Sequence, residues 1–141
     1  MEPTVIPSLR PIYQRVVAEV CQAYLVTEEM LVGKSRVRRI VIARRAALVL
    51  LRNHSAGTLQ EVADCFGVTH SAVCHAGAEM ESLAMVDAFE RNRWDEVNRM
   101  MAATVPHVPG SARAALSALA DELEAQVRQL RATIEEMGRA A

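Results

Sequence analysis

A run of basic side chains in the middle of the sequence has the chemistry needed to bind a polyanion. There is no acidic residue between Glu29 and Glu61. Lysine and arginine neutralise phosphate groups, so a positive segment of this length favours contact with nucleic acid. The alternative is that these side chains form only a solvated face. The basic residues of the interval are Lys34, Arg36, Arg38, Arg39, Arg44, Arg45 and Arg52.

A second group of candidate residues begins a predicted helix further along the chain. Thr69, His70, Ser71 and Ala72 lie at its start, and His75 follows one turn later. Histidine and serine can hydrogen-bond a base or a phosphate, and an alanine methyl can pack on thymine. The free N–H groups of a helix N-terminus also attract phosphate. We expect this edge to contact base pairs in the major groove of double-stranded DNA.

Helical periodicity predicts an all-α domain, a helix-turn-helix bundle over residues 12–103, that positions both groups. Residues 1–11 are predicted to be an irregular, proline-spaced arm. Gly33 and Gly67 are predicted helix ends, and Thr58 with Glu61 has the spacing of a capping box. The predicted helices are residues 12–26, a single turn after Thr27, residues 39–53, 59–66 and 70–87, and a helix around residues 94–103.

The inward faces of these helices predict the hydrophobic core. In residues 39–53 the apolar face is opposite Arg38, Arg45 and Arg52. In residues 70–87 either Met85 or Val86 is expected to complete the buried face. The remaining predicted core residues of the later helices are Leu59, Val62, Ala63, Phe66, Val73, Ala76, Met80, Leu83, Trp94, Val97 and Met101.

A linker with two prolines, residues 104–110, precedes a long amphipathic C-terminal segment, residues 111–141. Its apolar residues follow a heptad pattern, which is typical of a coiled coil. The helix is expected either to pack on its own domain or to join a second copy or a partner protein. The predicted interface residues are Leu116, Ala120, Leu123, Val127, Leu130, Ile134 and Met137.

Composition argues against several other classes of protein. Three cysteines without a CxxC pair favour a reducing compartment, and neither a signal peptide nor a membrane span is found, so we expect a cytoplasmic, nucleoid-associated protein. His70, Cys74 and His75 lack a second ligand pair, and Cys65 and Cys74 fit as small buried residues, so no metal site is expected. We also expect no cofactor and no enzymatic activity. Glu28 replaces the glycine that a phosphate-binding loop needs before Gly33-Lys34, so no nucleotide is expected.

Three segments in register resemble the C-terminal DNA-binding domain of the bacterial chromosomal replication initiator DnaA family. They are GKSRVRRIVIARR, TLQEVADCFG and THSAVCHA, and the resemblance covers about residues 12–98. It implies an all-helical domain that binds short A·T-rich boxes near origins or promoters, without the ATPase part of the initiator. The departures are FGVTH in place of FGGRDH, Thr69 in place of an acidic residue, Ser71 and Ala72 in place of two threonines, and Arg45 where glutamine is common.

The resemblance also implies roles for individual residues. By position, Arg36 resembles the family's minor-groove arginine, Thr58 a phosphate contact at a helix cap, and Arg44 a phosphate or groove contact. Five to seven phosphate contacts predict a salt slope of roughly −4 to −6. The full set of residues predicted to contact DNA is Lys34, Arg36, Arg38, Arg39, Arg44, Arg45, Thr58, Thr69, His70, Ser71, Ala72 and His75.

Two classes of function follow from the sequence. In the first, the protein is a sequence-specific DNA-binding regulator of transcription or replication, in a bacterium or a phage. In the second, the altered base-reading segment belongs to a domain that now binds a protein partner and meets DNA only weakly. The retained His70, His75 and basic loop favour the first class.

Overall fold

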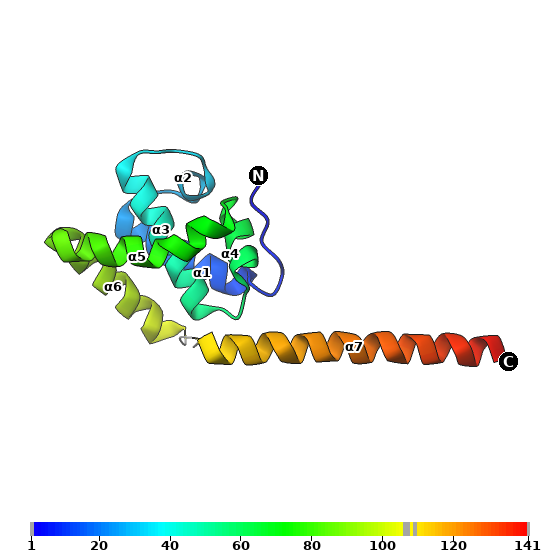
Figure 1. The fold of residues 1–141 in the computed structure, drawn as a ribbon. Coiled ribbons are helices and arrows are strands. Elements are labelled where there is room, and N and C mark those ends of the chain that lie inside the picture. The colour runs from blue at the N-terminus through cyan, green and yellow to red at the C-terminus, as the bar shows by residue number, and fades with distance from the viewer. Residues whose placement is uncertain (1, 106–107, 109, 141) are drawn as a thin grey trace. The chain divides into compact units, whose positions relative to one another are not determined.

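The computed structural model describes residues 2–105, 108 and 110–140, with side chains at 110–113 and 140 left undescribed. Within these residues the fold is all-α, as predicted, with seven helices and no strand (Figure 1). The chain forms two compact units, residues 1–108 and 109–141. The helices are α1 (Arg10–Tyr24), α2 (Glu28–Val32), α3 (Arg38–His54), α4 (Leu59–Phe66), α5 (His70–Val86), α6 (Ala88–Thr104) and α7 (Gly110–Ala140).

Helix α3 is the centre of the first unit, because it packs against α1, α5, α4 and α2. Figure 1 shows it between α1 and α5. Its side chains Leu50 and Leu51 are fully buried, and Tyr24, Leu31 and Phe66 of other helices belong to the same hydrophobic core. Burying one such leucine stabilises the fold by about 1.5–3 kcal/mol. The predicted inward face of α3 is confirmed, so its basic face is available at the surface.

The helix ends are set by the residues that the sequence indicated. The Thr27 hydroxyl accepts a hydrogen bond from the Met30 amide at 3.3 Å and caps α2. Thr58 and Glu61 form the predicted capping box of α4. Gly67 ends α4 in the left-handed region at φ 64°, where glycine carries no steric penalty. These local signals fix where the helix-turn-helix begins and turns.

The N-terminal arm and α6 differ from the prediction. Helix α1 begins at Arg10, and Leu9 of the arm is buried, while the Thr4 amide donates to the Asp64 carbonyl at 2.8 Å. Helix α6 begins at Ala88, six residues before the predicted Trp94. The reason is Asp87, whose side chain accepts a hydrogen bond from the Glu90 amide and starts a new helix directly after α5.

The early start of α6 also makes one core prediction wrong. Because α5 ends at Val86, the corner between the helices leaves Met85 82% and Val86 84% exposed. Leu59, Leu83 and Trp94 are only partly buried, whereas the other predicted core residues of these helices are buried. The corner is therefore an apolar surface, not part of the core.

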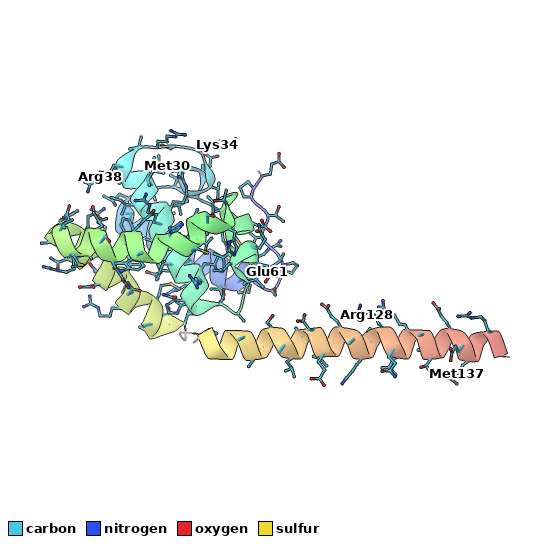
Figure 2. All side chains as sticks on the ribbon, viewed as in Figure 1. Met30, Lys34, Arg38, Glu61, Arg128 and Met137 are labelled. Carbon is cyan, nitrogen blue, oxygen red and sulfur yellow. The ribbon has the colours of Figure 1, made fainter. Side chains whose placement is uncertain are left out.

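The end of the first unit and the second unit complete the chain. The Val108 amide donates to the Asn53 carbonyl at 2.7 Å, whereas positions 106, 107 and 109 of the predicted linker lie outside the described residues. Helix α7 exposes every side chain from 114 to 139, and Arg128 and Met137 are labelled on it in Figure 2. In the part of the chain that the structure describes, no helix is long and apolar enough to cross a membrane.

Candidate nucleic-acid interface

Helices α4 and α5 form the predicted helix-turn-helix, with α5 in the place of a recognition helix. The Thr69 hydroxyl accepts a hydrogen bond from the Ala72 amide at 3.2 Å and caps α5. This cap leaves His70, Ser71 and His75 exposed at the start of the helix. The cap of α4 places a second threonine at the surface, because Thr58 accepts from the Glu61 amide at 3.1 Å while its O–H remains a donor that can bond a phosphate.

A groove of about 290 Å³ lies between α3 and the first turns of α5. Its lining combines predicted residues from two separate parts of the sequence, the basic helix and the recognition helix. His70 does not line it but is exposed on the same first turn of α5. The predicted residues that the groove brings together are Arg44, Arg45, Thr69, Ser71, Ala72 and His75.

Two of the predicted DNA-binding arginines are held by carboxylates of the same domain. Arg45 Nε lies 2.5 Å from Glu79 Oε2, on α5, and both side chains are about two-fifths exposed. Arg38 is 3.9 Å from Asp87, a weaker pair. An exposed ion pair contributes little to folding but it lowers the positive charge that a phosphate meets. A phosphate group therefore has to compete with these carboxylates for Arg45 and Arg38.

Arg44 anchors the basic loop to the domain, a role that the sequence did not reveal. Its Nε donates to the Leu31 carbonyl at 2.7 Å, and its two terminal nitrogens donate to the carbonyls of Ser35 (3.2 Å) and Met30 (3.1 Å). The first and last of these close the C-terminus of α2, where helix carbonyls lack partners. Burial lowers the pKa of this guanidinium from its usual value, and it stays protonated at neutral pH. The DNA contact that the sequence predicts for Arg44 stays a prediction.

The loop that Arg44 holds and the first turn of α3 carry the most available positive charge. Lys34, Arg36 and Arg39 are exposed, and none has an ion-pair partner within 4.0 Å among the described residues. The Val37 amide donates to the Ser35 hydroxyl at 3.3 Å, which tightens the loop before α3. Figure 2 shows Lys34 beside the loop and Arg38 at the start of α3, both on the outside of the domain.

Of the two cysteines predicted to be buried, the structure confirms Cys65 and contradicts Cys74. Cys65 is buried, and its burial raises the pKa of the thiol to about 11. Cys74 is exposed, so its predicted burial is wrong, and its Sγ lies 3.6 Å from Nδ1 of His70. The i, i+4 spacing puts these two side chains on one face of α5. Among the described residues, no group of three or more histidine, cysteine or acidic side chains could hold a metal ion.

Sequence reasoning missed three residues or roles in this region: the Glu79 and Asp87 pairs and the anchoring by Arg44. Glu79 had a detectable signal, because it follows His75 by four residues and so shares a helix face with it. Its pairing with α3 required the packing of two helices that are distant in sequence. The Arg44 contacts involve backbone carbonyls, whose positions no side-chain pattern indicates.

Comparison with known proteins finds that this region is similar to one family. Residues 13–79 match the family model described as the bacterial DnaA protein helix-turn-helix. The chain is 29% identical over 70 residues to the chromosomal replication initiator protein DnaA of Pseudothermotoga lettingae, a match covering 50% of this chain and 16% of that protein. It is 35% identical over 66 residues to the protein of the same name from Oleidesulfovibrio alaskensis, covering 47% and 14%. No solved structure gave a significant match.

Proposed function

Because residues 13–79 form a DnaA-type helix-turn-helix domain, which is a DNA-binding module, we propose that this protein recognises a specific sequence in double-stranded DNA. Helix α5 enters the major groove and presents His70, Ser71 and His75 to base edges. The loop before α3 inserts Arg36 into the adjacent minor groove, where narrow A·T-rich DNA attracts arginine.

One observation carries this proposal: an exposed polar edge and an exposed cationic loop belong to the same small domain. The edge is the start of α5. The loop contributes Lys34 and Arg36 and the first turn of α3 adds Arg39, and none of the three has an ion-pair partner among the described residues. Arg44 fixes the shape of that loop through carbonyls. A preformed loop loses less conformational freedom on binding, so more of the contact energy appears as affinity.

The proposed role is regulation of replication or transcription, by occupying boxes or by competing with an initiator for them. The two matched relatives are named as chromosomal replication initiators, and the matched segments cover 16% and 14% of their lengths.

We place the protein in the cytoplasm, at the nucleoid, and propose that it acts without enzymatic activity, cofactor or nucleotide. Hydrolytic activity lost in His70→Ala would contradict this part. Two copies join through the heptad residues of α7.

Selection from a random pool of duplexes, followed by fluorescence anisotropy on the selected and a scrambled sequence, tests the proposal. We expect preference for the selected duplex, reduced by His70→Ala by about 1–3 kcal/mol if that side chain contacts a base. Arg39→Ala should weaken binding to both duplexes equally, because phosphate contacts carry no sequence information. Equal binding to every duplex, abolished at moderate salt, would contradict sequence recognition.

A second candidate function, protein binding, is favoured by the corner between α5 and α6. Met85, Val86 and Phe89 are 82%, 84% and 65% exposed there, and adjacent exposed apolar side chains mark interaction surfaces. The carboxylates that hold Arg45 and Arg38 lie on α5 and at this corner. If protein binding is the principal function, Phe89→Ser abolishes the regulatory effect of the protein in cells while its binding to duplex DNA is unchanged.

A further inference from the structure

Helix α7 carries an apolar stripe that the structure leaves uncovered. Ala120, Val127 and Ile134 occupy one heptad position, and leucines or a methionine occupy the other. Ile134 and Met137 are 67% and 68% exposed, and the stripe continues along the helix. An apolar heptad stripe of this kind is the seam along which two or more helices supercoil around one another. The other exposed members of the stripe are Leu116, Leu123, Val127 and Leu130.

We propose that α7 pairs with α7 of a second copy in antiparallel orientation. This inference rests on the self-association included in the proposed function and goes beyond it by fixing the direction of the two helices. Two independent features support that direction: the charges beside the stripe and the sizes of the side chains within it.

The charges beside the stripe are complementary only when the helices run in opposite directions. Glu124 and Arg131 both lie at the heptad position that follows the leucines, and they flank a shallow groove with Leu123 and Val127. Neither has an ion-pair partner within 4.0 Å in the described part of the chain. In an antiparallel pair this position faces itself, so Glu124 meets Arg131 of the second copy, and the contact occurs twice by symmetry.

A parallel pair gives these charges no partner. There the same heptad position faces the one that precedes the stripe on the other helix, so that Glu124 lies opposite Leu119 and Arg131 lies opposite Gln126. A carboxylate beside leucine and a guanidinium beside an amide form no ion pair. Flanking charges set helix orientation in coiled coils, and here they favour the antiparallel arrangement.

The sizes of the buried side chains agree with the charges. In the antiparallel register Ala120 packs against Met137, Val127 against Leu130, and Ile134 against Leu123 of the second copy. The layers at Ala120 and Val127 therefore combine a smaller residue with a larger one, and in the third layer Ile134 meets a leucine of equal size. In a parallel pair Ala120 would face Ala120, leaving that layer underfilled, and underfilled layers destabilise a core.

The direction decides where the two DNA-binding domains are attached. A helix of 31 residues is about 46 Å long at 1.5 Å per residue. In the antiparallel register above, the domains leave from opposite ends of this rod, with attachment points about 55 Å apart at 1.5 Å per residue. A parallel pair would place both attachments at one end. The antiparallel dimer is therefore suited to hold two separate boxes, or two DNA segments, at once.

Charge exchange in the full chain tests this proposal, with self-association measured by sedimentation equilibrium. Glu124→Arg alone and Arg131→Glu alone each replace two attractions by two repulsions, so each should weaken dimerisation roughly tenfold. The double variant should dimerise like the natural chain. An equimolar mixture of the two single variants should form heterodimers preferentially, because both pairs are then complementary. Glu136→Arg, an equal charge change on the outer face, should have no effect.

Other outcomes would overturn the proposal. Dimers that tolerate both single variants and show no preference in the mixture would indicate a parallel pair. A monomer at every concentration would mean that α7 does not join two copies. Duplex binding measured on the same variants keeps the two proposals apart, because residues 2–105 are unchanged in all of them. Sequence preference without dimers would refute only the role of α7.

Discussion

Replacing Arg44 tests whether a single half-buried guanidinium shapes the DNA-binding loop. Arg44→Met keeps an apolar stem of similar length but removes the charge and the three hydrogen bonds to Leu31, Ser35 and Met30. The bond to Met30 is exposed, so we count the two part-buried bonds at roughly 1 kcal/mol each. The free energy of unfolding should fall by about 2 kcal/mol, measured by urea denaturation.

The effect on DNA separates a positioning role from a direct contact. If Arg44 acts only by holding the loop, its loss displaces Lys34 and Arg36, and the salt slope of binding should become shallower by roughly 1.8, or two contacts at about 0.9 each. Arg39→Met, which removes an exposed charge without a partner, should change the slope by roughly 0.9 and leave stability unchanged. Hydrogen exchange of the amides of residues 33–37 should accelerate in Arg44→Met only.

Arg44→Lys provides the decisive comparison, because it keeps the charge but cannot reach three carbonyls at once. We expect it to behave like Arg44→Met in hydrogen exchange and in salt slope. If Arg44→Lys matches the natural protein in both measurements, the reasoning is refuted and Arg44 contributes only its charge.

Four further predictions concern the same domain. Thr58→Ala breaks the α4 capping box and should lower stability by about 1 kcal/mol in urea denaturation, with Thr58→Ser as the control that restores it. Glu79→Gln releases Arg45 from its ion pair, so duplex affinity should rise and the salt slope should steepen by roughly 0.9; unchanged affinity would show that Arg45 faces no phosphate. A thiol reagent at neutral pH should modify exposed Cys74 quickly and Cys65 only upon unfolding. Burial raises the pKa of the Cys65 thiol, so the stability that this thiol contributes is present below the usual thiol pKa of 9.0 and is lost as the pH rises toward about 11. Cys65→Ala should abolish this pH dependence of the free energy of unfolding.

Much of the fold was predictable because its signals are local. A threonine before a glutamate, as at Thr58, and a glycine after an apolar helix, as at Gly67, fix helix ends through hydrogen bonds within a few residues. Asp87 is a signal of the same kind: it starts α6 six residues before the predicted Trp94, and the corner that results exposes Met85 and Val86.

The interface was less predictable because it depends on packing between distant segments. The sequence identified the cations, but it could not show that Arg45 meets Glu79 or that Arg44 meets the carbonyls that end α2. These contacts join residues 13 to 34 positions apart, and only the arrangement of α2, α3 and α5 brings them together. They lower the number of available cations, so the expected salt slope should be nearer −3 than −6, from Lys34, Arg36 and Arg39.

The central claim, that α5 and the basic loop together contact one DNA duplex, is tested most directly by nuclear magnetic resonance. The amide signals of the full chain would be recorded during titration with the selected duplex and with a scrambled one. We predict that the selected duplex shifts residues 69–75 and 34–39 together, whereas the scrambled duplex shifts chiefly residues 34–39. Shifts confined to the corner at Met85, Val86 and Phe89, or identical changes with both duplexes, would contradict the account.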